Sequence, residues 1–172
     1  MLAPAELMRD FVNTLDVESG ADELASPAEL ALWLRERGLA GPLDRAVDDD
    51  LTTALALREG LRAALRRQDG GSGGLPLLPL RLAIDPRPRL VAVESGIPGA
   101  LAVIAAAVTD ASWDRLKVCA EITCEWAFID FSKNRSRSWC SMRVCGNRTK
   151  TRAYRARKQG SRRLQASNTD TV

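Results

Sequence analysis

The sequence has 172 residues, of which 45% are hydrophobic and 27% are charged, and its formal net charge is +3. This length excludes two large domains, and the composition is too apolar for a wholly disordered chain. The charge is unevenly distributed: residues 1–130 hold 13 basic and 21 acidic side chains, whereas residues 131–172 hold 12 basic and one acidic. An acidic body followed by a basic segment predicts a polyanionic partner for that segment.

Several functional classes are disfavoured by what the sequence lacks. It has no histidine, which removes His-dependent catalytic triads and mixed Cys/His metal sites. The longest apolar run, residues 97–108, has 12 residues, whereas a membrane span needs about 20. The first residues show neither the cationic start nor the continuous apolar stretch of a secretory leader. We therefore expect a cytoplasmic protein that does not enter the membrane.

Three helices are predicted in the first part of the chain. Apolar residues four positions apart predict a short amphipathic helix over residues 7–16. Ser26 followed by Pro27 is typical of a helix start, and Gly38 is a suitable end for that second helix. Leucines at helical spacing predict a third helix that begins at about residue 44 or 50 and ends at about residue 68.

The middle of the chain contains a glycine-rich run and two short apolar runs in place of the helical patterns before it. The glycine-rich run over residues 70–74 is costly to order, so we expect a mobile loop there. Two short apolar runs, residues 80–84 and 89–93, flank a turn-prone Asp-Pro-Arg-Pro sequence and predict a β-hairpin. Pro98 opens an alanine-rich segment that we expect to be helical to about residue 109.

All four cysteines lie in the last third of the chain: Cys119, Cys124, Cys140 and Cys145. They form two pairs, each with four intervening residues, and the pairs are separated by 15 residues. This spacing is typical of metal sites, and four thiolates satisfy Zn²⁺ tetrahedrally with no open coordination position. We therefore predict one structural zinc ion. A disulfide or redox role and an iron–sulfur cluster are the less favoured alternatives.

The residues around the cysteines fit a small fold that needs a metal to be stable. Trp126 and Phe128 alternate along a predicted strand, and residues 149–158 contain no proline or glycine and predict a helix. A helix that starts beside the last thiolates directs its positive dipole end at the anionic cluster. This arrangement indicates a treble-clef-like finger, with both aromatic residues and Trp139 in its core rather than stacked on bases.

A longer motif covers the same region. The pattern C-x-W-x-F-x-D-x-S-K-N begins at Cys124, and R-x-W-C-S-M-x-x-C-G-N-R-x-K follows from Arg137. Together they resemble the CGNR zinc finger, whose four letters correspond to residues 145–148. The segment D-F-V-N-T at residues 10–14 resembles the start of the ABATE-type domain that often precedes this finger in bacterial stress-induced transcription regulators. One departure is Glu125, where members often have glycine.

The patterns and the resemblance together predict an α+β protein in three parts. Residues 1–111 form a mainly helical, ABATE-like domain with a small β-hairpin. Residues 112–160 form the treble-clef-like, four-cysteine CGNR finger. Residues 161–172 form a disordered tail.

The basic segment has the composition of a surface that binds polyanions, because residues 131–169 hold 12 Lys or Arg and no acidic residue. On a helix, Arg148, Arg152 and Arg155 share one face, and Asn147 and one or two arginines are able to read bases. We assign nucleic-acid contacts to ten residues: Lys133, Arg135, Arg137, Asn147, Arg148, Lys150, Arg152, Arg155, Arg157 and Lys158. The alternatives are a solvated basic face and arginines that offset the charge of the zinc–thiolate cluster.

The N-terminal part offers a candidate ligand pocket. Asp10 and Asn13 together with Arg58 could hold a small-molecule effector, although a structural network that ties two helices together is the favoured interpretation. Nothing in the sequence assembles a nucleophile, a base and an orienting group, so we do not expect an enzyme.

The resemblance implies a transcription regulator, and the basic segment predicts that it binds DNA. Its N-terminal domain would respond to stress or to a small ligand. The alternatives are an RNA-binding protein, or a protein-interaction adaptor built on a structural zinc site.

Overall fold

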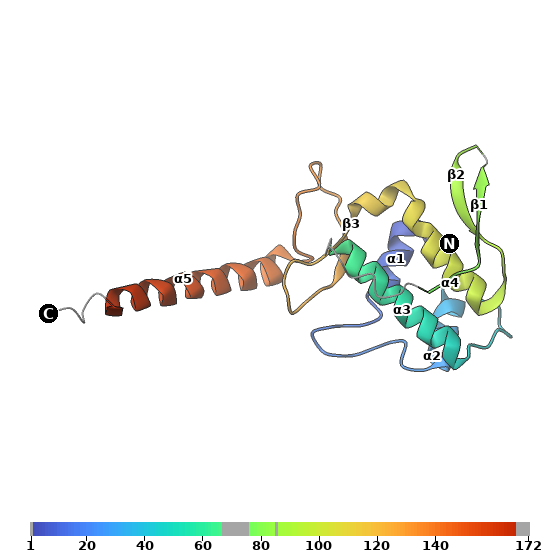
Figure 1. Ribbon diagram of the computed structural model, residues 1–172, viewed down its shortest axis with the longest axis horizontal. Helices are drawn as coiled ribbons and strands as arrows, with labels where there is room; N and C mark the ends of the chain where they lie inside the picture. The colour runs from blue at the N-terminus through green and yellow to red at the C-terminus, as the bar shows by residue number, and fades with distance from the viewer. Residues whose placement is uncertain (1, 67–75, 85, 168–172) are drawn as a thin grey trace.

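The computed structural model describes residues 2–66, 76–84 and 86–167, and for residues 160–167 it describes the backbone. Figure 1 shows a helical body with a hairpin at one corner and a single long helix that projects away from the body. The elements in chain order are α1 (Pro4–Val12), α2 (Pro27–Glu36), α3 (Asp48–Leu65), β1 (Leu80–Ile84), β2 (Pro88–Ala92), α4 (Gly96–Ala106), η1 (Ala107–Thr109), η2 (Ala111–Arg115), β3 (Leu116–Val118), β4 (Ala127–Ile129), η3 (Met142–Gly146) and α5 (Asn147–Ser167).

The α+β prediction is confirmed, since the described residues form mainly helices and two separate two-stranded antiparallel sheets. The first helix lies earlier than the predicted 7–16, because Pro4 occupies its first turn and Glu6 accepts the Ala3 N–H at 3.3 Å. The second helix starts and stops as predicted: Ser26 Oγ accepts the Glu29 N–H, and Gly38 has a φ of +69°. The predicted loop over residues 70–74 lies outside the described residues.

The main core lies between α1, α2, α3 and α4. Its fully buried members include Phe11, Leu30, Leu34, Leu101 and Ile104. Each sits on the apolar face of its helix, so the four helices are held chiefly by burial of hydrocarbon.

The predicted hairpin is present, with β1 and β2 paired in the register Leu80↔Ala92 and Leu82↔Leu90. Because side chains alternate along a strand, Leu80, Leu82 and Leu90 share one face. Leu80 at the base packs against the main core, whereas Leu82 farther out is exposed. The hairpin therefore presents an apolar face that is only partly covered.

A second, smaller core joins α1 to the finger strands. Ala5 and Met8 of α1 are buried against Leu116 of β3 and Ile129 of β4. The finger strands therefore form this small core together with α1, which supplies two of its four buried residues.

Polar contacts reinforce this seam. Asn13 Nδ2 donates to the Ala127 carbonyl at 2.9 Å, and the Ala127 N–H donates to Asn13 Oδ1 at 2.7 Å, so the carboxamide pairs with β4 as a neighbouring strand would. Buried Arg62 of α3 donates to the Val12 carbonyl at 2.8 Å and to the Glu125 carbonyl at 3.4 Å. The body and the finger strands are therefore joined by hydrogen bonds between side chains and backbone as well as by apolar packing.

Helix α5 is longer than the predicted 149–158 and runs through Ser167, into the segment that we expected to be a disordered tail. Its sequence is rich in Ala, Arg, Lys and Gln and has no proline, which favours helix. Residues 168–172 lie outside the described part of the chain. Among the described helices, none is long and apolar enough to cross a membrane.

Arg58 is a buried cation, 4% exposed, that joins α3 to the segment between α1 and α2. Its Nη1 and Nη2 donate to the two carboxylate oxygens of Asp22 at 2.7 and 2.9 Å, and Nη1 also donates to Thr14 Oγ1 at 3.2 Å. Burial opposes ionisation of both groups, but the pair outweighs it: the pKa of Arg58 is raised and the pKa of Asp22 is lowered. Such a bidentate pair holds the segment in one geometry.

Asp22→Ala should lower the free energy of unfolding by about 2–3 kcal/mol, because it removes the bidentate partner of a buried guanidinium and leaves it with the Nε contact to the Glu59 carboxylate at 3.0 Å. Urea unfolding of the zinc-loaded protein at neutral pH measures this. Removal of exposed Glu36 by Glu36→Ala, which changes the charge equally, should cost less than about 0.5 kcal/mol. Since the folded pKa of Asp22 is lowered, the wild-type advantage is present above the unfolded pKa of about 3.9 and should vanish as pH falls through the folded value. Equal stability of wild type and Asp22→Ala at neutral pH would contradict a structural role for this pair.

Candidate zinc centre and nucleic-acid interface

The four cysteines come together between the end of β3 and the start of α5. Their Sγ atoms all lie within 4.8 Å of one another, and Cys140 Sγ lies 3.6 Å from both Cys124 Sγ and Cys145 Sγ. A tetrahedral site with Zn–S bonds of about 2.3 Å has S–S edges of about 3.8 Å. The sulfur donors and their spacing therefore fit one structural zinc ion, held by these three residues and Cys119.

The first cysteine pair is held in a tight turn by backbone hydrogen bonds. The Cys119 N–H donates to the Trp126 carbonyl, and the Cys124 N–H donates to the Glu121 carbonyl, both at 2.9 Å. In the metal-free protein, burial raises the pKa of Cys124 to about 11. Zinc binds the thiolate, so loading the site displaces protons.

Glu125, directly after Cys124, adopts a φ of 53°. This left-handed conformation is unfavourable for most residues and free of strain for glycine, which gives a physical reason for glycine at this position in the resembling sequences. Here the Glu125 side chain forms an ion pair with Arg66, the residue that caps the end of α3. The contact adds a second link between the first cysteine turn and α3, beside the Arg62 hydrogen bond.

The second cysteine pair leads directly into α5 through the single turn η3. The N–H groups of Cys145 and Gly146 both donate to the Ser141 carbonyl, at 2.9 and 3.1 Å. A Cβ atom on Gly146 would lie 2.5 Å from Met142 Sδ, so any larger residue would displace Met142. The first turn of α5 is thereby placed beside the sulfur cluster.

Glu121 is fully buried and ties α5 to the first cysteine turn. Its carboxylate accepts hydrogen bonds from Arg152 Nη2 at 2.7 Å, Thr149 Oγ1 at 2.9 Å and Thr123 Oγ1 at 3.1 Å. The Arg152 contact is the largest cause that lowers the pKa of Glu121 to about 2, so the group stays ionised. Trp139 Nε1 also donates to Thr149 Oγ1 at 3.2 Å, which adds the second half of the finger to the same network.

Asp130, also fully buried, organises the loop after β4. It accepts from Lys117 Nζ at 2.7 Å and from the N–H groups of Ser132 and Arg137 at 2.9 and 3.0 Å. The lysine contact is the first cause that holds its pKa well below the usual range. Asp130 therefore pairs with Lys117 and caps the backbone of this loop.

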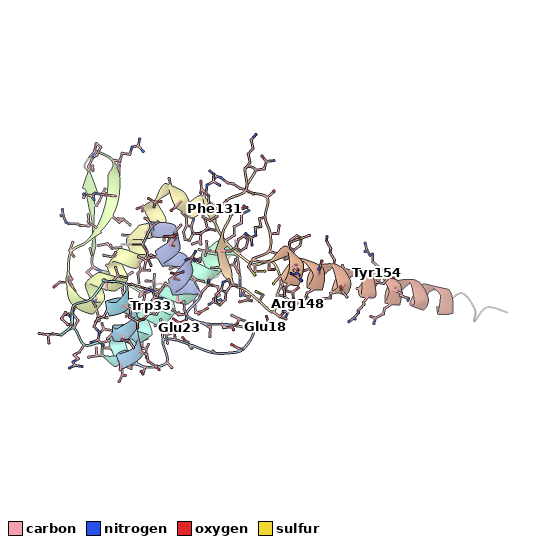
Figure 2. The ribbon with its side chains drawn as sticks, turned by 180° about the vertical axis from the view of Figure 1, so that it is seen from behind. Glu18, Glu23, Trp33, Phe131, Arg148 and Tyr154 are labelled. Carbon is pink, nitrogen blue, oxygen red and sulfur yellow. The ribbon has the colours of Figure 1, made fainter. Side chains whose placement is uncertain are left out.

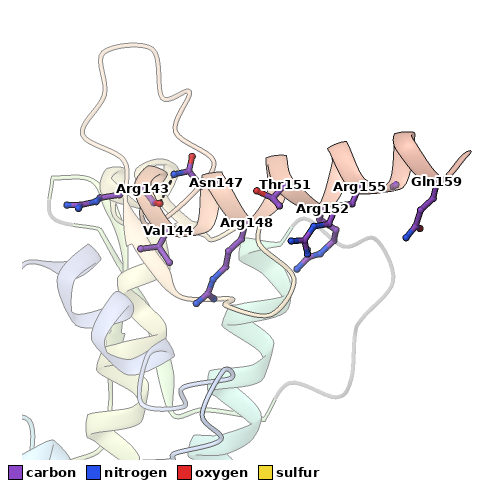
Figure 3. Close-up of a pocket in the computed structure, with 9 residues that line it drawn as sticks. Arg143, Val144, Asn147, Arg148, Thr151, Arg152, Arg155 and Gln159 are labelled. Carbon is purple, nitrogen blue, oxygen red and sulfur yellow. Dashed lines mark hydrogen bonds between the residues drawn. The ribbon is translucent and has the colours of Figure 1, made fainter. Parts of the chain in front are cut away.

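Four of the ten predicted nucleic-acid residues lie along one face of α5 and its entry turn. Figure 3 shows Asn147, Arg148, Arg152 and Arg155 along a shallow trough of about 770 Å³, with Arg143 at its start. The face expected for the three helical arginines is therefore present in the fold.

The other predicted residues lie elsewhere. Exposed Lys150, Arg157 and Lys158 are on α5 and do not line the trough, and Lys133, Arg135 and Arg137 belong to the loop between β4 and the third cysteine. Arg135 forms an ion pair with Asp114 at 3.2 Å. Arg137 donates to the Trp139 and Cys140 carbonyls. Its guanidinium carbon also lies over the Phe128 ring, 4.9 Å from the ring centroid. At least the last two cations therefore have structural contacts within the finger.

Two contacts on the α5 face were missed by the sequence analysis. Arg148 Nη1 donates to both carboxylate oxygens of Glu18 at 2.8 and 3.0 Å, which links α5 to the segment after α1 (Figure 2). Asn147 Nδ2 donates to the Arg143 carbonyl at 2.9 Å and so has a local role. No sequence signal points to Glu18, because the pair spans 130 positions.

The predicted ligand pocket is only partly assembled. Asp10 and Asn13 line a small cavity of about 210 Å³ together with Arg9, Glu23, Arg37 and Trp126. Arg58 does not line it, because its guanidinium is turned to Asp22 inside the body. Asn13 is engaged with β4 and Arg58 with Asp22, so both residues make structural contacts, but to a strand and to the segment between α1 and α2 rather than between two helices. Trp126 is 40% exposed at this cavity rather than in the core, whereas Phe128 is buried as expected.

Comparison with family models gives two matches that divide the chain. Residues 115–158 match the CGNR zinc finger. Residues 5–115, more than half of the chain, match the ABATE model, described as "Putative stress-induced transcription regulator". The chain belongs to the ABATE family. No curated protein matches the sequence.

The CGNR letters have distinct physical roles in this ABATE protein. Cys145 supplies a zinc ligand, and Gly146 allows close approach of the Met142 side chain. Asn147 bonds to the preceding turn, and Arg148 reaches the ABATE domain at Glu18. The motif therefore links the metal site, the start of α5 and the N-terminal domain.

Cys140→Ser should reduce bound zinc from one equivalent to less than about 0.1 after dialysis against a chelator, because three thiolates leave an incomplete structural site. Metal analysis measures this, and amide NMR spectra should show loss of dispersed signals from the finger while signals from α2 and α3 remain. Ser136→Ala in the exposed loop should keep the full equivalent. Retention of stoichiometric zinc by Cys140→Ser would contradict the assigned ligand set.

Proposed function

We propose that this protein regulates transcription by binding duplex DNA through the trough face of α5. The observation that carries the proposal is the helix itself, which starts at the zinc site and continues for 21 residues. It holds eight Lys or Arg and no acidic residue. A helix of this length spans about 30 Å, enough to follow a groove and meet phosphates on both sides.

The three arginines at the start of this face are suited to phosphate. Arg143 in η3 and Arg148 and Arg155 in α5 are exposed and line the same trough. A guanidinium binds a phosphate with two parallel hydrogen bonds. The Arg148–Glu18 pair is solvent-exposed, so it contributes little and a phosphate can replace the carboxylate. Arg152 is different, because it also neutralises buried Glu121.

Contacts to the phosphate backbone of DNA give affinity but do not distinguish one base sequence from another. The regulatory input belongs to the ABATE domain, whose family description names stress as the inducing condition. Both matching families are described as a regulator and a zinc finger rather than as enzymes. RNA remains the competing polymer that the experiment must distinguish.

Replacing Arg143, Arg148 and Arg155 together by glutamine should weaken binding of the zinc-loaded protein to random duplex DNA by more than about tenfold at 0.1 M salt. The slope of log affinity against log salt should also fall by about 2.7, the loss of three phosphate contacts. Fluorescence anisotropy at several salt concentrations measures both quantities. Arg152 is retained, so the Glu121 network and the zinc content stay intact.

The matched control replaces Lys150, Arg157 and Lys158 by glutamine. It removes the same charge from residues of the same helix that do not line the trough, and it should weaken binding clearly less than the first triple variant. Equal losses from both variants would contradict a specific face. Tighter binding to a single-stranded RNA of equal length would favour the RNA-binding alternative, and no binding to either polymer at low salt would favour a protein-interaction adaptor.

A further inference from the structure

A second cavity lies on the side of the body that faces the hairpin. It has a volume of about 460 Å³, is open on one side, and is lined by α3, the base of the β1–β2 hairpin, the end of α4 and the segment that follows α4. The residues that define its walls are Leu57, Gly60, Leu61, Leu80, Leu90 and Trp113. Every described residue that lines it is uncharged, in contrast with the charged cavity beside Asn13.

Small residues of α3 leave space in the cavity, whose other walls include large leucines of the hairpin. Gly60 stands in the middle of α3, and Ala64 follows one turn later on the same side. A glycine in a helix interior lowers helix stability relative to alanine, so this position carries a cost that hydrophobic packing alone does not require. Opposite it, Leu80 and Leu90 project from the same face of the hairpin. Because Gly60 lines the cavity, a large side chain at residue 60 would reduce its volume.

We propose that this cavity binds a neutral, apolar small molecule with up to three aromatic rings. Its volume falls in the range of small-molecule sites, which is about 300–1,000 Å³. Hydrocarbon walls without charged groups offer no partner to an ion, and apolar cavities take up apolar molecules in preference to water. The indole ring of Trp113 adds a flat surface against which an aromatic ring can stack.

The cavity walls are shared with the parts of the chain that hold the finger. Val108 and Trp113 pack both against the main core and against the small core that contains Leu116 and Ile129. Helix α3 lines the cavity with Leu61, and its next residue, Arg62, bonds to the first cysteine turn. A ligand in the cavity therefore touches the elements on which the finger rests, although binding at this site does not depend on the DNA proposal.

The test uses the full zinc-loaded chain and the neutral fluorophore N-phenyl-1-naphthylamine, titrated with excitation of tryptophan. Wild type should bind one equivalent saturably, with energy transfer to the probe. Gly60→Leu should weaken binding by about tenfold or more, because its side chain fills the cavity. Thr52→Leu, which adds the same side chain at an exposed position of α3, should keep the affinity within about twofold.

Two further variants keep the result interpretable. Leu90→Trp fills the cavity from the hairpin side and should also weaken binding, so the test survives if Gly60→Leu fails to fold. Trp113→Phe should keep binding but lose much of the energy transfer, because it removes the tryptophan in the wall. The proposal is overturned if wild type shows no saturable binding, if both filled variants bind as tightly as wild type, or if Trp113→Phe leaves the energy transfer unchanged.

Discussion

The position of every functional element in the finger depends on four sulfur atoms being held within reach of one metal ion. The sulfurs come from the turn after β3, from the end of a long loop and from η3, and α5 starts immediately after the last of them. Helix α5 carries eight Lys or Arg side chains and no acidic residue. The like charges repel one another along the helix, and the helix buries little apolar surface. Its direction is therefore set at its first turns, by the zinc site and by the buried carboxylate of Glu121 that holds Arg152.

Helix α3 connects this metal-dependent part to the body. Its apolar side contributes Leu57 and Leu61 to the main core, its buried Arg58 fixes the segment after α1, and Arg62 reaches the first cysteine turn. Asn13 adds a strand-like pairing to β4. Because the finger strands complete a core that α1 begins, the two family-defined regions are physically coupled. A structural change in either region therefore alters the contacts between α1 and the finger strands.

Local patterns predicted much of this structure. The cysteine spacing predicted one tetrahedral centre, and the Ser26 cap, the Gly38 stop and the hairpin follow from chemistry that acts within a few residues. The predicted bounds of α1 and α5 differ from those in the structure, because helix ends depend on weak capping interactions and on contacts with other parts of the chain. Arg58 could not be assigned correctly from its helical position alone, since its partner Asp22 lies 36 positions away.

The sequence by itself determined the donor set of the metal site, the mainly helical body and the concentration of positive charge after residue 130. Spacing, hydrophobic period and composition are local properties, so they can be read without coordinates. Only the tertiary structure decided which cations share the α5 face and which are engaged within the finger, as Arg137 is. It also placed Glu18 beside Arg148 and Gly60 opposite the hairpin, because contacts between distant segments depend on how complete surfaces pack.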